Sequence, residues 1–259
     1  MGDPGLFGPD SVAWRVLADP SMLLAGMRGL LIQALHPLAM AGVDQHSDYK
    51  VDPWGRLQRT VEYVVTTTFG DTAAAEAMGA RVRAVHERVV GVDPHTGRSY
   101  RAGDPELLAW VHNVEVHSFV AAYRRYGGWL SDGDADRFVG EMTRVAPLVG
   151  LDAAAVPSDL AGLRAVLKAA PLEMTPAARA GARTILSPPL PLAARPLYGV
   201  AVAGAISLLP RKVRAAYGFP WFPPADLAVR PALFGLLRAL NVALPDPLPL
   251  REAKARLAS

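Results

Sequence analysis

The chain has 259 residues, of which 51% are hydrophobic, so it can bury a substantial core and most of it is not disordered. It contains no cysteine, which excludes disulfides, cysteine-bound zinc, iron–sulfur clusters, thiolate-ligated haem and cysteine nucleophiles. Any bound metal must therefore use histidine or oxygen ligands.

The formal net charge of +3 hides a difference between two parts of the chain. Residues 1–186 carry 18 Lys and Arg against 21 Asp and Glu, whereas residues 187–259 carry nine against three. The basic residues of this tail are spread among Leu, Ala and Pro rather than clustered with aromatic side chains. This composition favours peripheral contact with an anionic membrane surface, or with an acidic partner, over nucleic-acid binding.

The N-terminus has no basic segment followed by a continuous apolar stretch, so we expect no secretory signal and a cytoplasmic protein. The longest uncharged run, residues 196–210, is shorter than the roughly 20 residues that a membrane-spanning helix needs. We expect this run to be a buried or an interfacial helix.

Asp-Pro pairs predict several helix starts, because Asp caps free N–H groups and Pro is tolerated in the first turn. Apolar spacing predicts helices from Asp19 to Pro37, from Asp52 to Gly70, over Asp71–Val90, and from Asp104 to Gly127. Further helices are expected from Ser131 to Val149 and over Ser158–Ala170, Thr175–Leu186, Leu192–Leu209, Arg211–Tyr217 and Asp226–Leu244, the last with a kink at Pro231.

No segment alternates with period two for long enough to predict a strand. We therefore predict an all-α fold and a single domain over residues 1–259. Its motif-bearing core spans about residues 17–150. The basic, apolar helices of residues 187–259 should pack around that core.

His86 stands on the apolar stripe of its predicted helix, beside Val82 and Val89. A neutral imidazole there needs a partner for its ring nitrogens. It is either a core histidine bonded to a carbonyl or an axial ligand to haem iron, the one common iron site that needs a single protein ligand in an apolar pocket.

Arg56, Arg59, Thr60 and Tyr63 follow one another at i, i+3, i+4 and i+7, which places them along one side of a helix. This polar side borders the apolar positions of the same helix. It is either a solvated face or a cationic, hydroxyl-bearing wall that faces an anionic or oxygenated ligand.

The remaining histidines give no metal site by spacing. His112 and His117 are five residues apart and point in different directions on a helix, so joint chelation is not expected. His36 is expected to cap carbonyls at a helix end, and His95 to lie in an exposed turn. No glycine-rich phosphate loop or nucleophile elbow is present.

Five motifs occur in a characteristic order. They are QALHP at Gln33–Pro37, HSDY at His46–Tyr49, DPWGRLQRT at Asp52–Thr60, HERVVG at His86–Gly91 and DPELLAWVH at Asp104–His112. Together they resemble the haem-dependent oxygenase family that includes the rubber oxygenases, or latex-clearing proteins, and the prenyl-cleaving oxygenase of mycophenolic acid biosynthesis. The resemblance covers mainly residues 17–150.

The resemblance implies a globin-like helical core with additional helices, a b-type haem and His86 as the proximal iron ligand. It places Arg56, Arg59 and Thr60 on the distal side, and it leaves His112 to support the haem site. The reaction implied is dioxygen-dependent oxidation of a lipophilic, isoprenoid-type alkene.

Two departures from the family pattern point away from rubber itself as the substrate. Arg59 stands where the rubber oxygenases have a lysine, and a guanidinium cannot coordinate iron. No Glu precedes Arg59, so the distal glutamate of that family has no counterpart. A haem- or lipid-binding carrier or sensor is the alternative function, and a purely structural helical module is a third.

Overall fold

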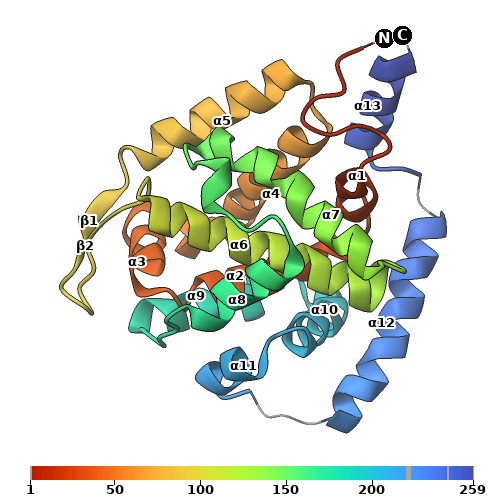
Figure 1. Ribbon diagram of the computed structural model, residues 1–259. Coiled ribbons are helices and arrows are strands. Elements are labelled where there is room, and N and C mark those ends of the chain that lie inside the picture. Colours follow the sequence, from red (N-terminus) through yellow and green to blue (C-terminus); the bar gives the residue numbers. More distant parts are fainter. Residues whose placement is uncertain (1, 220–222, 244, 259) are drawn as a thin grey trace.

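The computed structural model describes residues 2–219, 223–243 and 245–258, and in them the chain forms thirteen α-helices and one two-stranded hairpin (Figure 1). The all-α prediction is confirmed. The helices are α1 (Val12–Leu17), α2 (Met22–Gln33), α3 (Pro37–His46), α4 (Pro53–Phe69), α5 (Thr72–His86), α6 (Pro105–Ala122), α7 (Asp132–Met142), α8 (Leu160–Ala169), α9 (Pro176–Leu186), α10 (Arg195–Ser207), α11 (Arg211–Tyr217), α12 (Pro223–Ala243) and α13 (Leu248–Ala258).

Aspartate caps start two of the helices that matter most for the site. The Asp52 carboxylate accepts a hydrogen bond of 2.8 Å from the Gly55 N–H at the start of α4. Asp71 accepts one of the same length from the Ala74 N–H and starts α5. Both bonds satisfy N–H groups that the first helical turn leaves free.

The segment after α2 differs from the prediction. Pro37 does not only end one helix but occupies the first turn of the next, α3, where its missing N–H costs nothing. His36 caps no carbonyl there. Its Nδ1 accepts a hydrogen bond of 3.4 Å from the Ala39 N–H and so caps α3 from the N-terminal side.

The helix predicted over Asp71–Val90 ends earlier, at His86. The chain then enters the hairpin of β1 (Val90–Val92) and β2 (Ser99–Arg101), which pair antiparallel with Gly91 opposite Tyr100. Strands of three residues are too short to show an alternating pattern, so no sequence signal predicted them. His95 lies in the turn between them, as expected.

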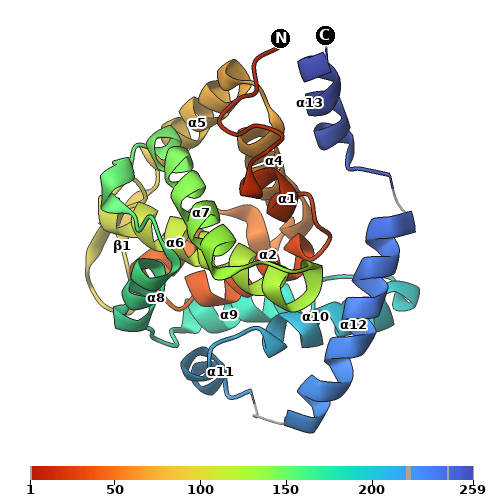
Figure 2. The ribbon, with the colours of Figure 1, turned by 45° about the vertical axis from the view of Figure 1, so that its right-hand side comes forward.

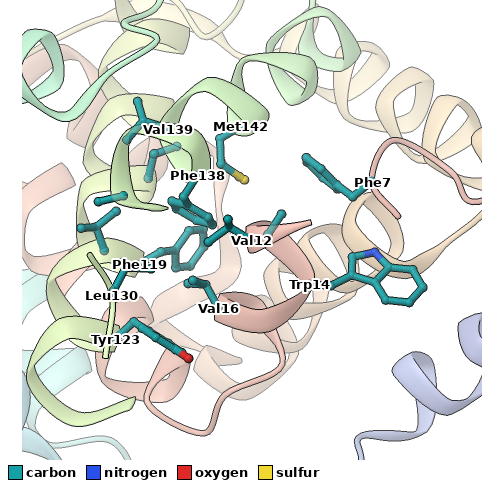
Figure 3. Packing of buried hydrophobic residues seen from close by; sticks show 14 of the residues in the cluster. Phe7, Val12, Trp14, Val16, Phe119, Tyr123, Leu130, Phe138, Val139 and Met142 are labelled. Carbon is teal, nitrogen blue, oxygen red and sulfur yellow. The ribbon is translucent and has the colours of Figure 1, made fainter. Parts of the chain in front are cut away.

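The largest buried cluster joins the N-terminal segment to α4, α6 and α7. Phe7, Trp14, Phe119 and Phe138 meet in it with smaller side chains of the same helices (Figure 3). The Trp14 indole N–H donates to the Thr68 carbonyl over 3.0 Å, which anchors the C-terminal end of α4. One end of α4 is therefore held in the core, while its N-terminal half carries the polar wall.

The helices α2 and α6 lie side by side at the centre of the molecule (Figure 1). The tail helices pack on this centre. Leu233 and Leu237 of α12 contact Leu24 of α2 and Tyr126, which follows α6. The last helix, α13, returns to the N-terminal segment, so both ends of the chain lie close together (Figure 2). Within α12 the helix continues through Pro231, and Leu244 lies outside the described residues.

Candidate functional site

The polar wall of α4 is built from side chains one turn apart. The Arg56 guanidinium donates from Nη1 to the Thr60 hydroxyl over 2.5 Å, and that hydroxyl donates to the Arg56 carbonyl over 3.1 Å. Since Thr60 is both acceptor and donor, it holds Arg56 along the helix. Tyr63 continues the same face one turn further.

His86 is the last residue of α5, and its imidazole ring differs from the other side chains of the site in its hydrogen bonding. Its Nδ1 is buried and has no hydrogen-bond partner among the residues that the structure describes. Burial lowers the pKa of His86, and the positive charge of Arg56 lowers it further. The imidazole is therefore kept neutral, the form that can offer a nitrogen lone pair to a metal.

Arg56 is largely enclosed, whereas Arg59 is exposed. Burial lowers the pKa of Arg56, and the neighbouring charge of Arg59 is the second cause. A guanidinium remains protonated at neutral pH despite such shifts. The N-terminal half of α4 therefore places the positive charge of Arg56 close enough to His86 to act on its ring.

A third helix contributes an acid. Glu115 of α6 is surrounded by protein, and this burial raises the pKa of its carboxyl to about 7. The carboxyl makes no hydrogen bond to any described residue and is not sealed off from solvent. Its charge contributes to the raised pKa of Tyr63, for which burial is the larger cause, so Glu115 and Tyr63 are close enough to interact electrostatically.

His112 lies one turn before Glu115 on α6 and is buried. Burial lowers its pKa to about 4, so its ring is neutral at physiological pH. No described interaction joins His112 to His86 or Arg56. The structure brings Arg56, Thr60 and His86 together. The role of His112 in supporting the haem site stays a prediction.

Large apolar side chains remain exposed on the same three helices. On α4 they form the stripe Trp54, Leu57 and Val61, in which exposure reaches 48% at Val61. Val85 of α5 and Val111 of α6 are 49% and 40% exposed. Helices that pack in a core usually bury such residues, so this grouping suits an apolar ligand.

These features fit a haem. Nδ1 of His86 has no partner, so this residue would be the single protein ligand that haem iron needs. The exposed apolar side chains of α4, α5 and α6 would suit an apolar, planar cofactor. In the described part of the chain no three His, Asp or Glu side chains gather as they would around a bare metal ion. The residues present therefore suit haem better than a metal cluster.

Glu115 is the one member of the site that the sequence did not single out as functional. Its signal was an acidic residue among apolar ones along the helix that begins after Asp104. That pattern also occurs wherever an acid reaches the surface, so it carried little weight without the partner helix.

No single described helix is long and apolar enough to cross a membrane, although α2 and α3 pass such a test as a pair that is bent by 105°.

A protein-family model described as "ER-bound oxygenase mpaB/B'/Rubber oxygenase, catalytic domain" matches residues 14–241. Comparison with curated proteins and with solved structures gives no significant match. The match covers all the site residues and extends well beyond the five motifs.

Proposed function

The chain belongs to the family of ER-bound oxygenases mpaB/B' and rubber oxygenases, and from this membership we propose that it is a haem b-dependent oxygenase that acts with dioxygen on a lipophilic, isoprenoid-type alkene. The observation that carries the proposal is the buried, unpartnered Nδ1 of His86 beside a cationic wall and exposed apolar side chains. When bound, haem would supply the iron that activates dioxygen.

His86 would hold the cofactor as its protein ligand. Its ring is neutral because burial and the charge of Arg56 both oppose protonation. A neutral imidazole binds iron, whereas an imidazolium has no free lone pair. Arg56 thus acts on His86 even before any ligand is present.

Arg56, which Thr60 holds in place, would stabilise negative charge that develops on oxygen during the reaction. The Arg56 guanidinium has five N–H donors and uses one of them on Thr60. Positioned donors in an enclosed site stabilise such charge without reorganisation at the moment of reaction. Arg59 adds a second positive charge on the same helix but cannot coordinate iron.

The apolar stripe of Trp54, Leu57 and Val61 would bind the hydrocarbon part of the substrate or the face of the cofactor. Glu115 would retain a proton on its carboxyl below about pH 7 and so offer a hydrogen-bond donor within an otherwise apolar wall. His112 is buried and neutral on the same helix, and we assign it a supporting role.

The absorption spectrum of the protein expressed with ample haem tests the cofactor. We expect a Soret band for the wild type and its loss in His86→Ala. The control His95→Ala changes a histidine in the hairpin turn and should keep the band. A wild type without a Soret band after haem reconstitution would contradict the proposal.

A carrier or sensor that binds haem or lipid without turnover is the second candidate. It is favoured by the absence of any Glu before Arg59, because the rubber oxygenases that the chain resembles have a distal glutamate there. Oxygen consumption measured with a panel of isoprenoid alkenes separates the two functions. Spectral binding without oxygen uptake would support the carrier.

We also propose that the tail touches anionic membranes from the cytoplasmic side. Leu192 and Leu197, at the start of the tail, are largely exposed, and so is Arg195 between them. Exposed apolar and basic side chains together favour an anionic lipid surface. Cosedimentation with anionic but not neutral vesicles, lost in Leu197→Asp, is the expected result, and equal binding to both would contradict it.

A further inference from the structure

Arg28 of α2 is a buried cation whose charge the structure leaves unbalanced. The residue is 1% exposed and is among the largest fully buried side chains. No ion pair joins it to a carboxylate in the part of the chain that the structure describes. Burial lowers its pKa to about 9, so it is still protonated at neutral pH.

The partners of the guanidinium are neutral. Nε donates to the Leu208 carbonyl over 2.9 Å, and Nη1 donates to the Ser118 hydroxyl over 2.6 Å. Nη2 lies 2.9 Å from Nδ1 of His117. Hydrogen bonds of this kind satisfy donors but do not cancel a full charge in a region of low dielectric constant.

His117 does not supply the negative charge that would balance Arg28. Because a guanidinium only donates, Nδ1 of His117 accepts and the ring hydrogen lies on Nε2. Burial lowers the pKa of His117 to about 3, with further contributions from the charges of Arg28 and Arg164. The ring is therefore neutral, and its Nε2–H remains a donor without an acceptor among the described residues.

A cavity of about 30 Å³ adjoins these groups. Arg28, His117 and Lys212 are its polar lining residues, and apolar side chains such as Ile32 and Trp110 complete the wall. The Lys212 ammonium donates to the Leu167 and Lys168 carbonyls, over 2.9 Å in each case. Every charged side chain in the lining is thus positive.

We propose that this cavity binds a single monatomic anion, for which chloride is the physiological example. A cavity of this size has room for one or two water-sized particles, which favours a monatomic anion over phosphate, sulfate and organic carboxylates. The anion would balance Arg28 at the contact between α2 and α6. The site is separate from the wall of α4 and does not depend on haem binding.

Thermal unfolding of the full-length protein tests the site. Chloride is exchanged for gluconate, a bulky monovalent anion, at constant ionic strength. Because a ligand that binds only the native state stabilises it by mass action, the unfolding midpoint should rise by roughly 3–5 °C for each tenfold increase of chloride above its dissociation constant. Equal midpoints in the two salts would overturn the proposal.

The variant Arg28→Met removes the charge while keeping an unbranched apolar side chain, and it should abolish the chloride dependence. Arg88→Met, at an exposed position after α5, should retain it. A crystal of the wild-type protein grown in bromide gives a direct reading that needs no variant. We expect an anomalous peak from bromide in the cavity. If other bromide sites in the crystal are fully occupied and the cavity shows no peak, the proposal is overturned.

Discussion

Arg56 on α4 and His86 at the end of α5 are electrostatically coupled: the guanidinium charge lowers the pKa of the imidazole. Burial is the larger cause of that shift, and both causes favour the neutral ring. The arginine therefore has two effects in one site. It presents a cation to a ligand, and it keeps the neighbouring histidine able to bind a metal.

Removing the Arg56 charge should move the pKa of His86 back toward its ordinary value. In Arg56→Gln we expect the pKa of His86 to rise but to stay below its ordinary value, since burial still opposes protonation. The measurement is an NMR titration of the histidine rings in the cofactor-free protein. Arg88→Gln serves as the control and should leave the pKa of His86 unchanged, and an unchanged value in Arg56→Gln would show that the two groups do not interact.

Thr60→Val should release the guanidinium of Arg56 from the helix. The new side chain has the same shape but neither accepts from Nη1 nor donates to the Arg56 carbonyl. We expect the free energy of unfolding to fall by about 1 kcal/mol, the usual net value of an intramolecular hydrogen bond. Urea unfolding measures it.

The control for that variant is Thr66→Val, on the same helix, whose hydroxyl makes no described hydrogen bond. It should change the free energy of unfolding by less than about 0.5 kcal/mol. Equal losses in the two variants would mean that valine destabilises α4 through its low helix propensity rather than through the loss of Arg56.

The exposed stripe of α4 should matter for the ligand more than for the fold. Val61 is half-exposed, so Val61→Asp should change the unfolding of the cofactor-free protein by no more than about 1 kcal/mol. A charge placed against an apolar ligand costs far more, and haem affinity should fall by at least about tenfold. Val92→Asp in the hairpin has similar exposure and should leave haem affinity unchanged, and equal affinities in the two variants would remove α4 from the binding wall.

Much of the fold could be predicted because local chemistry decided it. Asp52 and Asp71 start their helices through their own side chains, and a cap acts over three residues whatever the rest of the chain does. The role of Pro37 was harder to predict, because proline both ends one helix and suits the first turn of the next. The N–H of Ala39 donates a hydrogen bond to His36, and this single bond caps the helix that begins at Pro37.

The polar wall of the site could be predicted because its residues follow one another on one helix. Arg56, Thr60 and Tyr63 share a face of α4 by spacing alone. The electrostatic interaction of Tyr63 with Glu115 depends instead on how α4 and α6 are placed, and no periodicity carries that information. The unbalanced charge of Arg28 was hidden for a similar reason, since its partners Ser118 and Leu208 are 90 and 180 residues away.

Glu115 should make the stability of the protein depend on pH in a defined direction. Its pKa is raised by burial from 4.5 to about 7, so the native state holds a proton that the unfolded chain has already released in this range. Stability is therefore full below about pH 4.5 and falls as the pH rises through about 7. Glu115→Gln, which cannot ionise, should remove this fall.

The gain in the variant should grow from near zero at about pH 4.5 to on the order of 2–3 kcal/mol at about pH 8, as measured by denaturant unfolding across that range. The control Glu106→Gln changes an exposed acid in the first turn of the same helix and should keep the wild-type pH dependence. Binding of haem would change the surroundings of Glu115, so the cofactor-free and haem-loaded proteins should differ in this profile. Parallel profiles for wild type and Glu115→Gln would show that the carboxyl is ionised in the native state and reaches bulk water.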